Sequence, residues 1–171
     1  MIKENTNIKI YLLPLLITLS FLLRLIAIYF YRDVDLYSSN VNEWNVLLYN
    51  LSEHKSYSFY VFDNLRVPSV YMPPIYPFFL YLIKVITSFE DANLLYTIIF
   101  IQIILSTYSV YIFYQLNQNF FSNKLSLINS VIFSFFPLNV YACGQISSIN
   151  LQIIFSLLFL KFLLLLINKE K

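Results

Sequence analysis

Long apolar runs alternate with short polar segments along this chain. Four runs have about the 20 residues that a helix needs to cross a bilayer. These are residues 8–30, 92–116, 125–142 and 151–167. A fifth run, residues 74–89, is shorter, opens with prolines and carries Lys84 near its middle. We expect it to be an interfacial or re-entrant helix, so the predicted fold is an all-α integral membrane protein with about four spans.

The polar segment at residues 31–73 contains a second helical pattern. Over residues 39–54, apolar side chains recur at the three- and four-residue steps of a helix. They are Val41, Trp44, Leu47, Leu48 and Leu51, whereas Asn42, Glu43, Asn50 and Glu53 fall mostly off this stripe. The pattern predicts an amphipathic helix resting on the bilayer surface, with Trp44 and Tyr49 suited to the interface.

Lysine positions predict how the runs are oriented. If residues 74–89 do not cross, Lys3, Lys9, Lys124, Lys169 and Lys171 all fall on the side opposite the polar segment. Cytoplasmic loops carry an excess of Lys and Arg, so we expect a cytoplasmic N-terminus and an external polar segment. The first run is too long for a signal-peptide core and lacks a small-residue cleavage site, so it is predicted to remain as an anchor.

Composition narrows the class of protein. Hydrophobic residues make up 59% of the chain and charged residues 12%, against about 25% charge in soluble domains. The single cysteine, Cys143, excludes an internal disulfide framework and is expected to be a packed thiol. With one histidine and no Walker, Rossmann or Gly-x-Ser-x-Gly motif, neither zinc nor Cys–His chemistry is expected. No basic patch indicates a nucleic-acid partner, and no internal repeat divides residues 1–171, so one domain is predicted.

Acidic residues concentrate in the polar segment. On an extended segment Asp33 and Asp35 point the same way, which suits a divalent cation, although topology alone also produces acidic residues beside a span. Glu43 is the stronger candidate for a general base, because low-dielectric surroundings raise a carboxyl pKa. A solvated glutamate on a helix face is the alternative. We predict Glu43, Asp35 and Asp33 as catalytic candidates, and Asp33 and Asp35 as the only candidate metal ligands.

Basic residues supply candidate phosphate contacts. Arg66 and the pair His54-Lys55 are external, and Lys84 lies near the expected level of lipid phosphates. A solvated loop residue is the alternative for His54. Arg24, inside the first span, is predicted to anchor the helix or pair it with another. Lys161, inside the last span, has no evident partner in the sequence, so its partner is expected in another chain or in a part beyond this sequence.

Several motifs resemble one family. They are Asn40-Val-Asn-Glu43-Trp44-Asn-Val-Leu-Leu48-Tyr-Asn50-Leu51, Lys55-Ser-Tyr57-Ser-Phe59, and Pro68-Ser-Val-Tyr71-Met-Pro73-Pro74-Ile-Tyr76-Pro77-Phe-Phe-Leu80. Together they resemble the first external loop of the polyprenyl-phosphate-dependent glycosyltransferases of the GT-C superfamily, such as protein O-mannosyltransferases and the lipid A aminoarabinose transferase. Phe136-Pro137-Leu-Asn-Val-Tyr141 and Ser147-Ser148-Ile-Asn150-Leu151 resemble the segment leading to that family's second external loop.

The resemblance implies an enzyme of the bacterial inner membrane with a periplasmic active site. It implies transfer of a sugar, with inversion, from a polyprenyl-phosphate donor to a lipid, glycan or protein acceptor. Glu43 matches the family's loop carboxylate and would act as base or orient the acceptor. Tyr71 and Tyr76, beside and within the Pro-Pro-x-Tyr-Pro element, join Arg66, His54 and Lys84 as predicted substrate-binding residues.

The chain also departs from the family. Asn40 stands where relatives often carry Asp, and Ser148 and Asn150 stand where they often carry an acid. Family enzymes have many more spans, so the chain is expected to be an N-terminal part of such an enzyme. The alternative is a non-catalytic membrane subunit that binds a partner protein or a lipid. A small transporter fits less well, because ionisable groups are few in the spans and no paired broken helices are evident.

Overall fold

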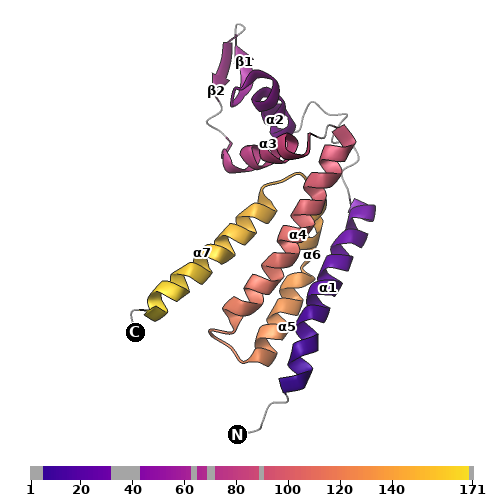
Figure 1. The fold of residues 1–171 in the computed structure, drawn as a ribbon, viewed down its shortest axis with the longest axis vertical. Coiled ribbons are helices and arrows are strands. Elements are labelled where there is room, and N and C mark those ends of the chain that lie inside the picture. Colours follow the sequence, from indigo (N-terminus) through magenta and orange to yellow (C-terminus); the bar gives the residue numbers. More distant parts are fainter. Residues whose placement is uncertain (1–5, 32–42, 63–64, 69–71, 89–90, 170–171) are drawn as a thin grey trace. The chain divides into compact units, whose positions relative to one another are not determined.

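The computed structural model describes residues 6–31, 43–62, 65–68, 72–88 and 91–169 of the chain (Figure 1). Most of the described residues are helical, and they form two compact units. Unit 1 consists of Met1–Arg32, Ile101–Gln145 and Ile149–Lys171. Unit 2 consists of Asp33–Phe100 and Ile146–Ser148.

Three helices of the described part are long and apolar enough to cross a membrane. They are α1 (Thr6–Tyr31), α4 (Asp91–Asn117) and α7 (Ile149–Lys169). They cover the apolar runs at residues 8–30, 92–116 and 151–167, as the hydropathy pattern predicts. A short apolar helix, α3 (Ile75–Thr87), lies in the fifth run.

The apolar run at residues 125–142 differs from the single helix that we predicted. It forms α5 (Asn123–Ser134) and α6 (Pro137–Tyr141), followed by the 3₁₀ turn η2 (Ala142–Gly144), with a bend of 55° at the break. Pro137 causes the break, because proline disfavours helical geometry in the residue before it. Phe136 accordingly has φ −62° and ψ 120°, which is extended backbone. A fourth span exists only if this bent pair counts as one.

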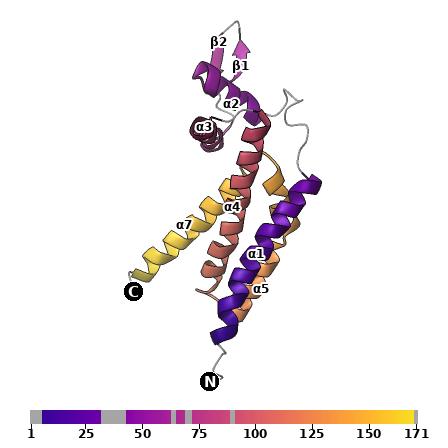
Figure 2. The same ribbon diagram turned by 45° about the vertical axis from the view of Figure 1, so that its right-hand side comes forward.

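The helices of unit 1 bury polar side chains and expose apolar ones. In α5 the buried residues are Ser126, Ser130 and Ser134, which recur every four residues on one helix face. Small residues let helix backbones approach closely in a membrane, where apolar side chains gain little by leaving lipid. In two views α1 lies beside α5 (Figures 1 and 2).

Unit 2 contains a small sheet that the sequence analysis did not predict. Its strands β1 (Ser58–Phe62) and β2 (Leu65–Pro68) pair antiparallel, with Tyr60 opposite Val67 and Phe62 opposite Leu65. The hairpin follows α2 (Glu43–His54) and precedes α3. Its signal in the sequence is a run of aromatic and β-branched residues followed by Asp63-Asn64, a pair that favours turns.

The apolar stripe of α2 was predicted to face the bilayer. In the structure it is covered by other parts of the protein. Leu47, Leu48 and Leu51 are buried, and α2 packs on both α3 and β1. Asn50, which we expected off the stripe, is also buried, and its Nδ2 donates to the carbonyl of Ser58 at 2.8 Å. The bond ties the hairpin to the helix, so a polar residue at this position stabilises the unit by satisfying a carbonyl.

Candidate functional site

Helices α2 and α3 run in the same general direction, so unit 2 has an end where both begin and an end where both finish. At the first end, the rings of Trp44 and Tyr76 meet edge to face with centroids 4.9 Å apart. At the second end, Lys84 Nζ lies 3.6 Å from Glu53 Oε1. The long connection through the hairpin makes this arrangement possible, because helices with the same direction cannot be joined by a short turn.

The end where the helices begin holds the predicted base. Glu43 is exposed in the first turn of α2, where the helix dipole favours negative charge. Tyr76 is 2% exposed, and its hydroxyl accepts a hydrogen bond from the backbone N–H of Ser147. Burial raises the pKa of Tyr76 well above the ordinary range. This tyrosine therefore stays neutral and fixes the aromatic contact beside Glu43.

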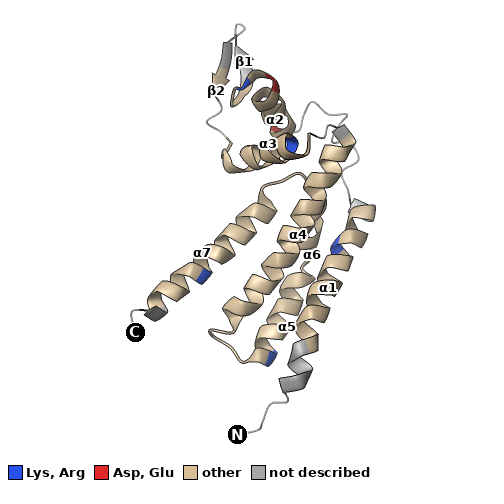
Figure 3. Ribbon diagram, in the orientation of Figure 1, with Lys and Arg blue, Asp and Glu red and all other residues tan. Residues whose placement is uncertain are grey.

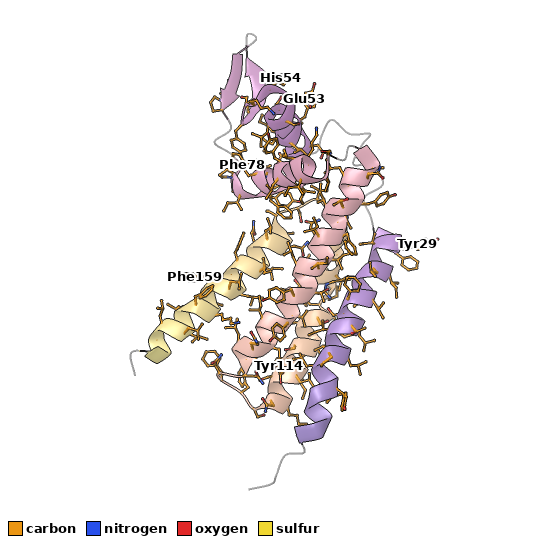
Figure 4. All side chains as sticks on the ribbon, in the orientation of Figure 1. Tyr29, Glu53, His54, Phe78, Tyr114 and Phe159 are labelled. Atoms are coloured by element: carbon orange, nitrogen blue, oxygen red, sulfur yellow. The ribbon has the colours of Figure 1, made fainter. Side chains whose placement is uncertain are left out.

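The end where the helices finish gathers two lysines. Lys55 Nζ donates to the carbonyl of Ser52 at 2.9 Å, and Lys84 Nζ donates to the hydroxyl of Ser52 at 3.2 Å. Lys55 also lies 3.4 Å from the hydroxyl of Tyr81. Figure 3 shows acidic positions on α2 and a basic position on α3, and Figure 4 labels Glu53 and His54 on α2. The lysines oppose the negative C-terminal dipoles of both helices.

Both helices end with a residue in the left-handed region. Lys55 and Ser88 each have φ 53°. The N–H of Ser56 donates to the carbonyl of Asn50 at 3.2 Å, and that of Ser88 to the carbonyl of Lys84 at 2.9 Å. These bonds satisfy carbonyls that a helix end leaves free. The end of unit 2 that holds Lys55 and Lys84 is called the lysine end below. Capping of the two helices explains why lysines occur there, whether or not they bind a ligand.

The predicted base and the predicted phosphate ligand lie at opposite ends of α2. Ten residue steps separate Glu43 from Glu53, or about 15 Å at the helical rise of about 1.5 Å per residue. Lys84 contacts Glu53, so one small reacting group cannot touch both Glu43 and Lys84. Among the described residues, the carboxylate that contacts Lys84 is Glu53, which was not predicted as a site residue.

The other predicted site residues are placed as follows. His54 is exposed at the end of α2, with its ring 5.6 Å from that of Tyr49. Arg66 lies in β2 opposite Val61, and its side chain is outside the described part. Asp33, Asp35 and Tyr71 are also outside the described residues. Within the described part, no three His, Cys, Asp or Glu residues are grouped as a metal site.

Arg24 joins two helices of unit 1. Its Nε donates to Ser106 Oγ on α4 at 2.9 Å, and its Nη1 bonds both the hydroxyl and the carbonyl of Ser20. The side chain is fully buried, so it does not reach the interface as an anchor, and helix pairing is the arrangement that the structure has. Cys143 is a packed thiol, and its Sγ lies 3.2 Å from the carbonyl of Asn139.

Lys161 has a partner within the chain, contrary to the sequence-based prediction. Its Nζ donates to Gln115 Oε1 on α4 at 2.7 Å, and Gln115 Nε2 donates to the hydroxyl of Tyr111 at 2.6 Å. The prediction was wrong because sequence periodicity places residues on one helix but does not say which residue of another helix lies opposite.

Ser52 and Tyr81 were missed by sequence reasoning, and neither gave a signal. Lys55 was recognised with His54 as an external basic residue at the end of a predicted helix. The convergence of the two lysines depends on how α2 packs against α3. No known protein family, curated protein or solved structure matches the chain. The two ends of the α2–α3 pair and the sequence resemblance are therefore the features of this chain that bear on function.

Proposed function

We propose that this chain is the N-terminal membrane module of a glycosyltransferase that uses a sugar linked to polyprenyl phosphate. Support comes from the resemblance of the polar segment to the GT-C loop and from one observation in unit 2. An exposed carboxylate, Glu43, stands at the shared beginning of two helices whose packing is fixed by Trp44 and Tyr76. A rigidly positioned base on a helix is the arrangement that proton transfer requires.

In the proposed reaction, an acceptor hydroxyl attacks the anomeric carbon of the donor sugar. The bond between that carbon and the phosphate oxygen breaks, polyprenyl phosphate leaves with the electron pair, and the hydroxyl proton passes to Glu43. The backbone N–H groups in the first turn of α3 face the same end and favour an anionic group. Asp33, Asp35, Arg66 and Tyr71 remain candidates for further contacts with the donor or a divalent cation.

The lysine end of unit 2 is the alternative reaction centre. There Glu53 would be the base, and Lys55 and Lys84 would bind the leaving phosphate, because two ammonium groups converge on Ser52. Glu43 is favoured because Glu53 already faces Lys84, an arrangement that a surface ion pair explains. His54 would belong to this alternative centre, because it lies at the same end of α2.

A place for unit 2 at the outer membrane surface is part of the proposal. Helix α3 ends at Thr87 and the apolar stretch of α4 begins at Ala92. Five residue steps span at most about 18 Å, so α3 cannot lie far from the bilayer. It exposes an apolar stripe of Ile75, Phe78, Leu82, Val85 and Ile86, which suits an interfacial helix. Lysine positions support a cytoplasmic N-terminus, and the resemblance supports the bacterial inner membrane.

A matched pair of substitutions tests this proposal. Glu43→Gln and Glu53→Gln make the same change on one helix, at its two ends. Sugar transfer from a radiolabelled polyprenyl-phosphate sugar is measured in membranes of cells that express the protein. We expect Glu43→Gln alone to lower turnover, by about 10²–10⁴-fold as for loss of a general base. Loss in Glu53→Gln alone would move the reaction to the lysine end, and unchanged transfer in both would exclude a carboxylate base on α2.

A non-catalytic membrane subunit is the second candidate function. The observation in its favour is the exposed stripe of α3, because large exposed apolar patches mark contacts with proteins or membranes. This alternative predicts that the protein copurifies with a larger membrane protein. It also predicts that neutralising Glu43 and Glu53 together leaves copurification unchanged.

A further inference from the structure

The bend in unit 1 creates a groove that takes no part in the proposed reaction. The groove has a volume of about 450 Å³ and is broadly open to the exterior. It is lined by Phe113 of α4, by Asn129, Ile132 and Phe133 of α5, and by Phe136 and Asn139 at the break and on α6. Its volume falls in the range of about 300–1,000 Å³ that is common for small-molecule sites.

The walls of the groove are mostly apolar and include two stacked rings. Phe113 and Phe133 stack with centroids 4.4 Å apart and planes 15° apart. The two amides are held by the protein, because Asn129 Nδ2 donates to Asn117 Oδ1 and Asn139 Nδ2 donates to the carbonyl of Phe133. The groove therefore suits an occupant that has no polar groups of its own.

The mouth of the groove is continuous with the apolar outer surface of candidate spans. Ile132 is 63% exposed and Phe136 is 51% exposed. The neighbouring exposed residues of this surface, Ile128, Val131 and Phe135, are also apolar. Helix α4 and the bent pair both meet the length and hydropathy expected of a span. In a bilayer this surface faces hydrocarbon, and lipid tails are the most abundant material able to enter an open apolar groove.

We propose that this groove holds one hydrocarbon tail of a bilayer phospholipid. The tail fills the space that the kink at Pro137 opens, and its contacts with the stacked rings replace those that a straight helix would make. The phospholipid is a bound structural lipid and not the sugar donor, since none of the candidate catalytic residues lines the groove.

Fluorescence quenching in the full chain tests this proposal. The chain has a single tryptophan, so Trp44→Phe gives a background for Phe136→Trp inside the groove. Phe135→Trp is the matched control, because Phe135 is similarly exposed, at 45%, but does not line the groove. Each protein is purified in detergent and titrated with a phosphatidylcholine that carries bromines on its acyl chains.

We expect an equimolar amount of the brominated lipid to quench Phe136→Trp several-fold more strongly than Phe135→Trp. Adding Ile132→Phe, which narrows the groove, should abolish the difference, whereas Ile128→Phe on the same helix should preserve it. Equal quenching at both tryptophans would show ordinary lipid contact and overturn the proposal. A Phe136→Trp that no lipid quenches would overturn it too, because another protein segment would then cover the groove.

Discussion

Helix α1 of unit 1 and helix α2 of unit 2 use polar and apolar residues in opposite ways. In unit 1 the buried positions include Arg24, Ser106 and Ser130, while Leu22 and Ile26 are exposed on α1. In unit 2, Leu47 and Leu51 of α2 form the core, while Glu43 and Glu53 of the same helix are exposed. Figure 4 shows the outward position of Tyr29 on α1, and Figure 3 shows no acidic position among the described residues of unit 1.

The difference is the one expected if the candidate spans of unit 1 lie in lipid and α2 meets water. Burial of an apolar side chain away from water stabilises a fold, at about 25 cal/mol per Å². Helices in lipid gain little from such burial, so packing of small residues and hydrogen bonds between helices hold them together. The same residue type therefore contributes differently to the stability of the two units. Substitutions at matched positions measure that contribution.

The largest expected effect is at the core of unit 2. Leu47 is fully buried, so Leu47→Ala should cost about 3 kcal/mol of unfolding free energy. The matched Leu22→Ala, at a position 46% exposed on α1, should cost less than about 0.5 kcal/mol. Trp44 emission reports unfolding of unit 2, and far-ultraviolet circular dichroism reports the whole chain, both in detergent. Similar losses for the two variants would remove the contrast between the units.

The next effect is expected at Arg24. Arg24→Lys keeps the charge but loses the planar fork that reaches Ser20 and Ser106 together. We expect a loss of about 1–2 kcal/mol, since hydrogen bonds between membrane helices contribute about 0.6 kcal/mol each on average. Thermal unfolding of the detergent-solubilised protein measures it, with Ser106→Ala as the variant that removes one bond only. An Arg24→Lys protein of unchanged stability would mean that packing alone pairs α1 with α4.

Alkaline pH should weaken unit 2 through its buried tyrosine. The folded pKa of Tyr76 is raised by burial, so the folded state keeps a proton that the unfolded state loses above its ordinary pKa of about 10. The contribution is fully present below that pH and falls by about 1.4 kcal/mol for each further pH unit. Trp44 emission against denaturant between pH 8 and 11 measures the slope.

Tyr76→Phe should flatten most of this alkaline slope. Burial also raises the pKa of Tyr57, whose hydroxyl donates to the carbonyl of Met72, so a smaller slope of the same sign should remain. Tyr57→Phe is the matched control and should remove only that smaller part. A slope that persists unchanged in Tyr76→Phe would assign the alkaline loss to other groups.

The smallest effect is expected at the surface of unit 2. The pair Lys84 and Glu53 is partly exposed, so Lys84→Met should cost no more than about 1 kcal/mol at low salt. The loss should shrink further at high salt because screening weakens exposed ion pairs. Glu53→Gln is the companion variant. A large loss that salt does not change would show that Lys84 acts through its packing and its bond to Ser52.

Much of the fold follows from local patterns, and most of the candidate site does not. Hydropathy predicts the apolar helices, and the three- and four-residue steps of Leu47 and Leu51 predict the buried face of α2. The same pattern does not tell what covers that face, so the bilayer was expected where α3 and β1 pack. The bend had a local signal in the sequence, which is Pro137 itself. A hydropathy average over many residues does not detect it.

By itself, the sequence determined that this chain has long apolar helices around a polar segment, because segment length and hydropathy are properties of consecutive residues. It also carried a local signal for the break before Pro137, because proline acts on its immediate neighbour. Only the tertiary structure decided that Glu43 and Lys84 lie at opposite ends of unit 2, that Lys161 meets Gln115, and that Arg24 joins α1 to α4. These facts depend on which helix faces stand opposite each other, and packing of the whole unit fixes that choice.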